Sequence, residues 1–451
     1  MLNFSYSLPD YVTTVISKLE HCGYEAYAVG GCVRDMLMGK EPDDFDVCTN
    51  ALPQQMLTVF ADFKIIETGL KHGTVTVVIE NNHVEITTYR IDGNYIDNRH
   101  PENVEFTSRL KDDLVRRDFT INAMVYCPSK GIIDYFGGVE DLKNKIIRCV
   151  GNADERFNED ALRIMRAIRF ASVLGFEIHK DTHNSILKNT PLLKNISAER
   201  KATELNKLLC GKDVCRILMQ YASVICHIIP PLCDCVGLDQ KSPHHIYDVY
   251  THTVESIRHS DNNLYIRLAL LLHDVGKPAC MTIDDTGRGH FYGHPEISAA
   301  MTKEVLSNLK YDNHTIKLVT TLVKYHDREL PKTPKAAKRL LNTLTLPVFE
   351  MFLKVTRADR LAHSEAGIAA RMKEVEDCKA LVDEIIAKQQ CFSLDDMAFD
   401  GKDLIALGLK PGPKIGYILN TLLAEIMDEQ LPNEKPLLTD RAKQLINQSE
   451  G

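Results

Sequence analysis

The hydrophobic pattern of the chain changes near residue 150, and this change limits the folds available to it. Before that point apolar residues recur at helical spacing over 8–23, closing at Gly23, and alternate in the short segments AYAVGG, FDVCT, HGTVTVVI and HVEITTYR. After it, segments such as DERFNEDALRIMRAIRFASVLGF and ISAERKATELNKLL carry apolar residues three and four apart, which predicts helices. We therefore expect an α+β fold, with a small mixed sheet and helices first and an all-α remainder.

A chain of 451 residues is too long for a single hydrophobic core. The stretch around 230–245 is rich in Pro, Asp and Gly, and it is the best candidate boundary. Residues 92–113 are polar with many turn formers and predict a long loop. We expect four parts: a head over 1–150, a helical neck over 151–235, a body over 240–388 and a helical tail over 389–451.

The composition is that of a soluble globular protein, with 44% hydrophobic and 26% charged residues. Its apolar runs are shorter than the roughly 20 residues that cross a membrane, and the N-terminus does not resemble a secretory signal. The thirteen cysteines are scattered without a CxxC framework. We expect a cytoplasmic protein with no membrane partner and no obligate protein partner. Its net charge of −8 still allows a local basic face, because Lys and Arg exceed acidic residues over 148–216.

Two acidic residues beside FDVCT are candidate metal ligands. Asp44 and Asp46 are two positions apart, so a strand would direct both side chains to the same face. A divalent cation relieves their repulsion, and Mg²⁺ suits oxygen ligands while leaving positions for phosphate. The plain alternative is a solvated acidic turn, to which we assign Asp43. Glu85 is a candidate third carboxylate that assists an attacking hydroxyl, or a residue that faces solvent.

The segment before these acids is suited to phosphate. Gly30 and Gly31 end a strand and open a helix-like segment, where backbone N–H groups can approach a phosphate. Arg34 adds a cation. Together with Asp44 and Asp46 they predict a triphosphate-and-metal site, in which bound metals would polarise an α-phosphate.

GGCVRDMLMG followed by DDFDV resembles the signature of class II nucleotidyltransferases of the polymerase β superfamily, which includes CCA-adding enzymes and bacterial poly(A) polymerases. The resemblance covers roughly residues 20–220. Further blocks match in order: HGTVTVV, VEITTYR, RRDFTINAM, DYFGGVEDL and EDALRIMRAIRFA. It implies that Asp44 and Asp46 are the paired ligands of Mg²⁺.

The block RRDFTINAM resembles the part of the family that contacts the sugar and phosphates of the nucleotide. This implies roles for Arg116, Arg117, Asp118 and Asn122, because Arg can bind phosphate with two hydrogen bonds and Asp or Asn can bind a ribose hydroxyl. The plain alternative is a helix N-terminus with charged residues in its first turn. That alternative explains Asp118 but not the two arginines.

The block EDALR contains Asp160 and Arg163, which share a face if the segment is one helix. Their spacing alone favours a salt bridge. The resemblance implies instead that they form a protein template, which bonds the Watson–Crick edges of cytosine and adenine. Both bases carry an exocyclic amine where uracil and guanine carry a carbonyl. Arg166 and Arg169 would hold the triphosphate or the RNA.

The loop YRIDGNYIDNRHPENVEF resembles the flexible loop with which CCA-adding enzymes switch from C to A. It contains Arg90, Asp92, Asp97 and Arg99. The resemblance therefore implies addition of CCA to the 3′ end of tRNA from CTP and ATP, with release of pyrophosphate. The alternatives are a poly(A) polymerase or an enzyme that adds only part of CCA.

A second set of metal ligands lies in the predicted body. LLHDVGKP resembles the HD phosphohydrolase superfamily, and the resemblance implies one metal bound by His252, His273, Asp274 and Asp359, with His294 and His326 able to hold another. Imidazole and carboxylate together suit Mn, Ni, Fe, Co or Zn. A metal-bound water would attack a phosphoester. Either this domain is a phosphohydrolase that repairs RNA ends, or it is a metal-free body that supports tRNA. A rival from another class is an HD phosphohydrolase whose head only binds RNA.

The tail contains GLKPGPKIGYIL, in which a Gly-Pro turn precedes a helix with Lys410 and Lys414 beside it. Backbone amides at that turn could bind an RNA phosphate, and tails of similar enzymes contact the tRNA elbow. The plain alternative is a capped connecting helix.

Overall fold

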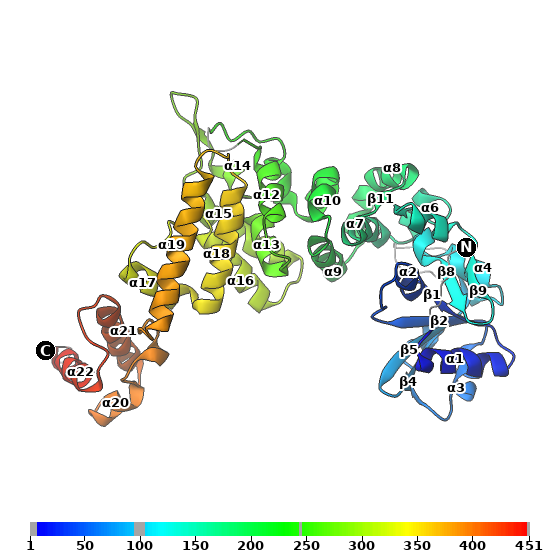
Figure 1. Ribbon diagram of the computed structural model, residues 1–451, viewed down its shortest axis with the longest axis horizontal. Helices are drawn as coiled ribbons and strands as arrows, with labels where there is room; N and C mark the ends of the chain where they lie inside the picture. The colour runs from blue at the N-terminus through cyan, green and yellow to red at the C-terminus, as the bar shows by residue number, and fades with distance from the viewer. Residues whose placement is uncertain (1–6, 94–103, 243–245, 449–451) are drawn as a thin grey trace. The chain divides into compact units, whose positions relative to one another are not determined.

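The computed structural model describes residues 7–93, 104–242 and 246–448 (Figure 1). The chain forms two compact units. The first consists of Met1–Cys233 with Asn308–Lys310, and the second of Asp234–Ser307 with Tyr311–Gly451. The division falls inside the Pro-rich stretch around 230–245. The finer division into four parts stays a prediction.

The first unit contains a seven-stranded mixed sheet in the order β3-β4-β5-β2-β1-β8-β9. Its only parallel pair among the described strands is β2 with β5, and the other neighbours are antiparallel. The four predicted strands are confirmed as β1, β2, β4 and β5. The strands span Ala26–Val29 (β1), Phe45–Thr49 (β2), Lys64–Ile66 (β3), Thr74–Ile79 (β4), Asn82–Thr88 (β5), Met124–Cys127 (β8) and Gly131–Asp134 (β9).

Short helices border this sheet and complete its core. The predicted N-terminal helix is confirmed as α1, and Gly23 follows its end with a left-handed φ of 85°. Side chains from α1, α2, α3 and α4 share one apolar core with the strands. The helices span Asp10–His21 (α1), Gly31–Leu37 (α2), Pro53–Val59 (α3), Leu110–Val115 (α4) and Gly138–Lys143 (α5), with 3-10 turns at Leu70–His72 (η1) and Thr120–Asn122 (η2).

The expectation of an unstructured loop over 92–113 is wrong at both ends. Strand β6 (Arg90–Asp92) pairs with β7 (Val104–Phe106), and α4 begins at Leu110. Val104 and Phe106 lie on one face of a short edge pair, a pattern too brief to stand out in a polar sequence. Residues 94–103 lie outside the described part of the chain.

The remainder of the first unit is helical, as predicted, apart from the short pair β10–β11. The predicted single helix through EDALR is wrong, because the chain leaves helical geometry at Asp160, with φ −133° and ψ 103°. The Asp160 carboxylate accepts a hydrogen bond from the Leu162 N–H, a local contact by which Asp interrupts helices. The elements are Ile146–Ile147 (β10), Ala153–Glu159 (α6), Leu162–Leu174 (α7), Glu177–Ile178 (β11), Lys180–Asn189 (α8), Thr190–Asn195 (η3), Ala198–Leu209 (α9), Val214–Gln220 (α10), Ala222–Ile228 (α11) and Pro230–Cys235 (η4), whose last residues reach the boundary.

The second unit is helical, as predicted, with one small hairpin, β12–β13, that the sequence did not indicate. Helices α12, α13, α16 and α18 pack against one another, and α20–α22 belong to a separate apolar core. The elements are Val249–Arg258 (α12), Leu264–Leu272 (α13), Lys277–Cys280 (α14), Thr282–Ile283 (β12), Gly289–His290 (β13), His294–Asn308 (α15), Asn313–Tyr325 (α16), Pro334–Leu344 (α17), Leu346–Leu361 (α18), Ile368–Ala387 (α19), Leu394–Asp396 (η5), Gly401–Ala406 (α20), Pro413–Met427 (α21) and Lys435–Gln448 (α22).

Among the described residues, no helix combines the length and the apolar character that crossing a bilayer requires.

Candidate functional site

The turn between β1 and α2 brings glycine close to arginine. Gly30 has a left-handed φ of 83°, and a Cβ there would lie 3.2 Å from Nη1 of Arg117. At Gly31 a Cβ would lie 3.7 Å from Nη2 of Arg34. Backbone conformation and the approach of Arg117 therefore both favour glycine at position 30.

Three carboxylates lie on or beside the parallel strands β2 and β5. Asp46 is the register partner of Glu85, and Asp44 directly precedes β2. Partial burial of the Asp46 carboxyl, together with the charges of Asp44 and Glu85, raises its pKa to about 6. Asp44, Asp46 and Glu85 are exposed. Asp43 lies in the preceding bend, as predicted.

A cavity of about 170 Å³ adjoins these strands and is lined by Asp46, Glu85 and three arginines, Arg90, Arg116 and Arg117. A space with both carboxylates and guanidinium groups can take a metal ion and a phosphate together. Arg90 is therefore the part of the predicted C-to-A loop that joins this site. Asp92 ends β6, while Asp97 and Arg99 lie outside the described residues.

The two adjacent arginines share one buried acid that sequence reasoning missed. Asp113 is 0% exposed and pairs with Nη2 of Arg116 at 2.6 Å and with Nη2 of Arg117 at 3.4 Å. Although burial opposes ionisation, the two guanidinium groups keep the pKa of Asp113 below its usual value. The signal was available, because an acid three and four residues before two arginines is typical of helical ion pairs.

A hydrogen-bonded chain joins the other predicted nucleotide ligands. Nη1 of Arg34 donates to the Asn122 side chain at 2.8 Å, and Asn122 donates to Asp118 at 3.1 Å. Asp118 also accepts from Nε of Arg166 at 2.8 Å. Although Asp118 is buried, Arg166 lowers the pKa of its carboxyl to about 2. Segments far apart in the sequence thus form one polar network.

Phe170 lies among three of the predicted basic residues. Its ring centroid is 5.2 Å from the Arg34 guanidinium carbon, 5.4 Å from that of Arg166 and 3.6 Å from that of Arg169. Cations lie favourably on aromatic faces, so the ring helps to hold three like charges near one another. Glu204 pairs with Arg169 at 2.8 Å and neutralises part of that charge.

The salt bridge that the spacing of Asp160 and Arg163 favoured is not formed. The Asp160 carboxylate pairs with Nη2 of Arg200 at 2.9 Å. Arg163 pairs with Glu159 at 2.5 Å and donates to the backbone carbonyl of Arg116 at 2.8 Å. The break before α7 separates the two side chains into different pairs, and Arg200 is a partner that sequence reasoning missed.

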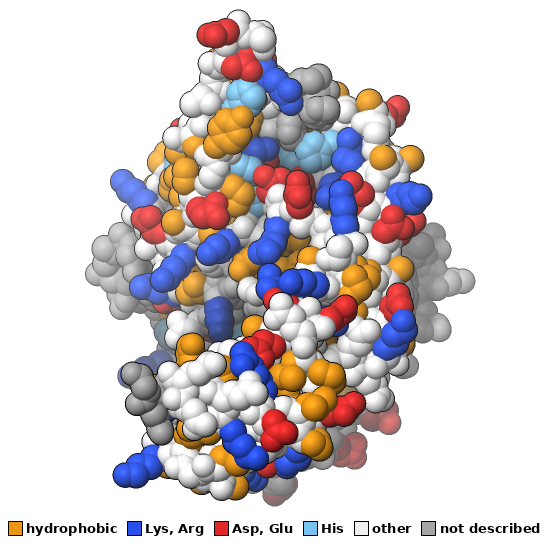
Figure 2. Space-filling view, turned by 90° about the vertical axis from the view of Figure 1, so that its left-hand side faces the viewer, with side chains coloured by type: hydrophobic (Ala, Val, Ile, Leu, Met, Phe, Trp, Pro, Cys, Tyr) orange, Lys and Arg blue, Asp and Glu red, His pale blue; other side chains and the backbone are white. Residues whose placement is uncertain are grey.

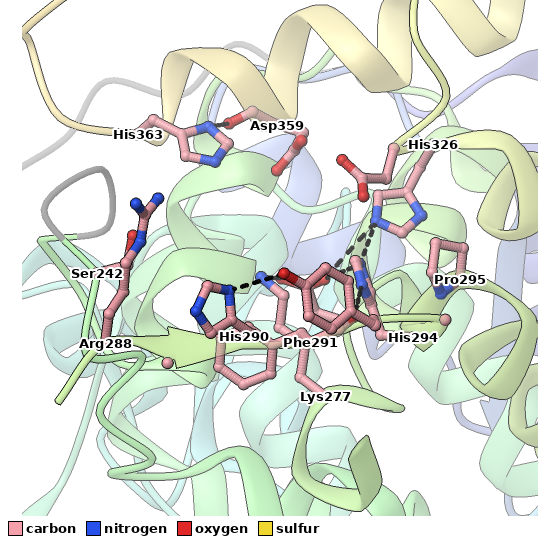
Figure 3. Close-up of a pocket in the computed structure, with 15 residues that line it drawn as sticks. Ser242, Lys277, Arg288, His290, Phe291, His294, Pro295, His326, Asp359 and His363 are labelled. Carbon is pink, nitrogen blue, oxygen red and sulfur yellow. Dashed lines mark hydrogen bonds and ion pairs between the residues drawn. The ribbon is translucent and has the colours of Figure 1, made fainter. Parts of the chain in front are cut away.

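The predicted histidine and aspartate ligands of the second unit come together, and Figure 3 shows three of them, His294, His326 and Asp359, around one pocket. Nε2 of His252 lies 2.8 Å from Oδ1 of Asp359, and Nε2 of His273 lies 3.5 Å from the same atom. They come from different elements: His252 from α12, His273 and Asp274 from the end of α13, His294 from α15, His326 from the end of α16 and Asp359 from α18.

Asp274 is the centre of this cluster. Its Oδ2 lies 3.2 Å from Nε2 of His273, and its Oδ1 lies 3.3 Å from Nε2 of His294 and 3.7 Å from Nε2 of His326. The six residues are each no more than 8% exposed. Although burial opposes ionisation, His273 and Lys277 hold the pKa of Asp274 well below its usual value.

The cluster has the properties of a metal site. Ligand atoms of His252, His273 and Asp359 lie within 4.8 Å of one another, as do those of His273, Asp274 and His326. Nε2 of His273 and Oδ1 of Asp274 are buried without a well-aligned hydrogen bond from the described residues, while Oδ2 of Asp274 pairs with Nζ of Lys277. Since unsatisfied buried polar atoms are costly, a cation would satisfy this arrangement. The donor set of imidazoles and carboxylates fits a divalent metal.

Sequence reasoning missed two groups at this cluster. The His363 ring lies 5.0 Å from that of His252. Lys277 is 5% exposed, and its Nζ lies 2.7 Å from Oδ2 of Asp274. Lys277 follows His273 and Asp274 in the same short segment, so its position could have indicated a role.

Three family models match separate parts of the chain. The poly(A) polymerase head domain matches residues 26–148, the RNA and SrmB-binding site of polymerase A matches 175–230, and tRNA nucleotidyltransferase domain 2 matches 292–442. Together with the carboxylates on neighbouring strands of the sheet, they define a nucleotidyltransferase, a class of enzyme that generally uses a divalent metal.

Similar proteins extend over nearly the whole chain. A CCA-adding enzyme of Ligilactobacillus salivarius is 35% identical over 437 residues, which are 96% of this chain and 96% of its own. The crystal structure of the Bacillus stearothermophilus CCA-adding enzyme in complex with CTP is 29% identical, has a TM-score of 0.69 and is matched over 97% of both chains. The Thermotoga maritima CCA-adding enzyme complexed with tRNA shares the fold, with a TM-score of 0.60 and 21% identity over 97% of this chain and 95% of its own. The chain belongs to the family of CCA-adding enzymes.

Proposed function

We propose that the chain adds C, C and A to the 3′ end of tRNA from CTP and ATP. The observation that carries the proposal is the register of Asp46 with Glu85 beside a cavity lined by Arg90, Arg116 and Arg117. This arrangement combines carboxylates for a metal with cations for phosphate. The membership in the CCA-adding family and the CTP complex of a relative support the choice of substrates.

Asp44 and Asp46 would hold Mg²⁺, with Glu85 beside them. Exposed oxygen ligands suit Mg²⁺ because it keeps coordination positions for phosphate oxygens. When bound, the metal lowers the cost of charge that develops on the α-phosphate. The 3′-hydroxyl oxygen of the tRNA bonds to the α-phosphorus, the bond to the bridging oxygen breaks and pyrophosphate leaves. Glu85 would take the hydroxyl proton.

The arginine network would bind the triphosphate. Arg34, Arg166 and Arg169 surround Phe170, and Arg117 lines the carboxylate cavity. Asp118 and Asn122 orient the first two of these arginines through the bonds described above. Their pre-set geometry spares the nucleotide the cost of arranging the charges on binding.

Asp160 and Arg163 would select the base. Arg200 orients the Asp160 carboxylate, and Glu159 with the Arg116 carbonyl orients Arg163. A carboxylate that already accepts two hydrogen bonds retains lone pairs for an exocyclic amine. Asp160 and Arg163 would thus contact the base while each is held by different partners.

The tail would contact the tRNA. The predicted turn is present, since residues 411 and 412 form a bend directly before α21, and Lys410 beside it is exposed. Phosphate contacts of this kind position an RNA without reading its sequence. We also propose a cytoplasmic location, because tRNA, the substrate we assign to the chain, is found there.

Extension of tRNA transcripts tests this proposal. Transcripts that lack CCA, CA or A are incubated with CTP, ATP or both, and the product lengths are read on a gel. Completion to CCA and no further supports the proposal. Indefinite A tails would assign a poly(A) polymerase, and arrest after C or CC would assign a partial enzyme.

The buried histidine cluster favours a second activity, a metal-dependent phosphohydrolase. A transition metal among Mn, Ni, Fe, Co and Zn would be held by His252, His273, Asp274 and Asp359, with His294 and His326 adjacent. When bound, it supplies a water of lowered pKa for attack on a phosphoester. Release of phosphate from RNA with a 3′-phosphate, dependent on one of these metals, tests it. Absence of hydrolysis with every metal would assign a supporting body, and hydrolysis without any extension would assign an HD phosphohydrolase with an RNA-binding head.

A further inference from the structure

The hairpin β12–β13 forms one wall of the cavity above the histidine cluster. The cavity has a volume of about 350 Å³. Its lining includes Asp274, His294, His326 and Asp359 from the cluster, together with residues 288–293 from the hairpin and the turn that follows it. Figure 3 shows His290 and Arg288 on the same cavity as His294 and His326. A ligand that reaches the metal ligands therefore also meets the hairpin.

Tyr292 is unusually exposed for an aromatic residue at a cavity. It is 78% exposed, although burial of a tyrosine ring is favourable. Its ring is stacked on that of His290 at a centroid distance of 5.3 Å and an interplanar angle of 7°. Figure 2 shows histidine side chains at the surface near hydrophobic and charged side chains in the upper part of the view. The second face of the Tyr292 ring meets solvent.

Hydrogen bonds within the hairpin hold the stacked rings of His290 and Tyr292 in place. Nε2 of His290 lies 2.8 Å from Oδ2 of Asp284, and the hydroxyl of Tyr292 lies 3.3 Å from Nδ1 of His290. Asp284 also accepts from the backbone N–H of Arg288 at 3.0 Å. Gly289 allows the hairpin to pack closely, because a Cβ there would lie 2.4 Å from the Gln240 carbonyl oxygen. A flat surface held in this way loses little freedom when a planar ligand stacks on it.

Arg288 supplies a cation on the same wall. It is exposed, lines the cavity, and makes no ion pair with another residue in the described part of the chain. Lys277, in contrast, is buried and already pairs with Asp274 and Gln240. Arg288 is thus the basic group of this wall that can meet a phosphate from outside.

We infer that the hairpin is a nucleobase subsite, in which Tyr292 stacks on the base next to the phosphoester and Arg288 pairs with the phosphate. The inference rests on the proposed phosphohydrolase activity and names its substrate class, a terminal nucleotide of RNA. Stacking on an aromatic ring tolerates every base, so the subsite recognises a nucleotide end without selecting its sequence. A phosphoester without a base would use only Arg288 and the metal.

Two oligoribonucleotides that end in a 3′-phosphate test the subsite. One carries a base on its last nucleotide, and the other is abasic there. The full-length protein with Mn²⁺ is compared with Tyr292→Ala. We expect this variant to raise KM about 10-fold for the oligonucleotide with the base, the scale of one base stack, and to leave KM for the abasic one unchanged. The kcat for each oligonucleotide should be the same in the variant and the native protein, because Tyr292 is outside the metal cluster.

Two controls and two outcomes complete the test. Tyr292→Phe keeps the ring and should behave as the native protein, and Tyr135→Ala, which removes another exposed ring, 48% exposed and outside the cavity lining, should do so too. Equal losses on both oligonucleotides, or no loss on either, would overturn the subsite while the hydrolase stands. A native protein that hydrolyses neither with any of the candidate metals would overturn the hydrolase and the subsite together.

Discussion

The carboxylates of the head and those of the histidine cluster meet solvent in opposite ways. Asp44, Asp46 and Glu85 are exposed on or beside two strands. Asp274 and Asp359 are 1% and 8% exposed. Among the described residues, groups of ligand atoms within 4.8 Å of one another occur only in the cluster. The carboxylates of the head need further ligands to complete a metal site, whereas the packing of the helices already brings the ligands of the histidine cluster together.

Under the proposed functions, this difference would distinguish a metal that arrives with the nucleotide from a metal that resides in the protein. A nucleotide brings phosphate oxygens that complete the coordination of Mg²⁺, so the protein needs few ligands there. The cluster offers its own ligands, and its buried acids make it attractive to a cation. Although burial opposes a charged ring, Asp274 raises the pKa of His273 to about 10. The buried acid therefore stabilises a positive charge at this position.

The largest effect is expected from Asp46→Asn. Losing this charge should lower tRNA extension about 10³-fold, the scale of one lost electrostatic group in an active site, and spare hydrolysis. It should also slightly raise the free energy of unfolding of the metal-free protein, because it relieves repulsion from Asp44 and Glu85. Single-turnover extension and urea unfolding measure the two effects. Asp43→Asn, in the neighbouring bend, is the control and should stay active. Loss of both activities would contradict separate sites.

Metal binding should stabilise the second unit. Mn²⁺ at a hundred times its Kd should raise the free energy of unfolding by about 2.7 kcal/mol after chelator treatment. His273→Ala removes an atom common to both ligand groups and should abolish most of this gain. Thermal unfolding with and without Mn²⁺ measures it. His259→Ala changes an exposed histidine of the same unit and should retain the gain. A stabilisation that survives in His273→Ala would place the metal elsewhere.

Asp118→Asn tests whether the charge of Asp118 stabilises the hydrogen-bonded network of the head, by the pH dependence of the free energy of unfolding. The folded pKa of Asp118 is about 2, below its value in the unfolded chain, so its contribution is complete above about pH 4 and is lost as pH falls from about 4 to about 2. The variant should be about 2 kcal/mol less stable at pH 7, and the difference should shrink below about pH 4. Urea unfolding at several pH values measures it, with Asp62→Asn, at an exposed position, as control. A difference independent of pH would show that the charge of Asp118 is irrelevant.

The smallest effect is expected from Phe170→Leu. Loss of cation–π contacts worth about 0.5–1 kcal/mol should raise KM for CTP and ATP alike, by about threefold, with kcat little changed. Steady-state extension kinetics with each nucleotide measure it. Phe60→Leu truncates another buried phenylalanine of the first unit and should cost stability without changing KM. A change confined to one nucleotide would assign Phe170 to base selection.

The sequence predicted the parts that depend on local pattern. Strand alternation located β2 and β5 and thereby Asp46 and Glu85. An apolar segment that ends in His273 and Asp274 located the centre of the cluster, because buried polar groups at a helix end need partners. The resemblance supplied the order of the remaining blocks, and the similar proteins confirm the family.

The parts that depend on pairing across the chain were missed. The register of Asp46 with Glu85 joins strands that are not consecutive, and no local pattern reports it. Asp160 was placed on a continuous helix because helical spacing extends across it, whereas its own side chain ends that continuity at Leu162. Glu204 meets Arg169 through the packing of α9 on α7, and Arg200 of α9 meets Asp160 in the break before α7. Periodicity alone can specify neither pair.

The break between α6 and α7 also separates the chain into segments that tolerate changes in length differently. A residue inserted into a continuous helix turns everything beyond it by about 100°. Because Asp160 and Ala161 interrupt the helices, an insertion within α6 can be absorbed there and leave α7 in place. An insertion after Leu162 would instead turn Arg166, Arg169 and Phe170 together, away from their partners Asp118, Glu204 and Arg34 on other elements. Length variation in this region should therefore be found before Asp160 and be absent from the three turns that follow it.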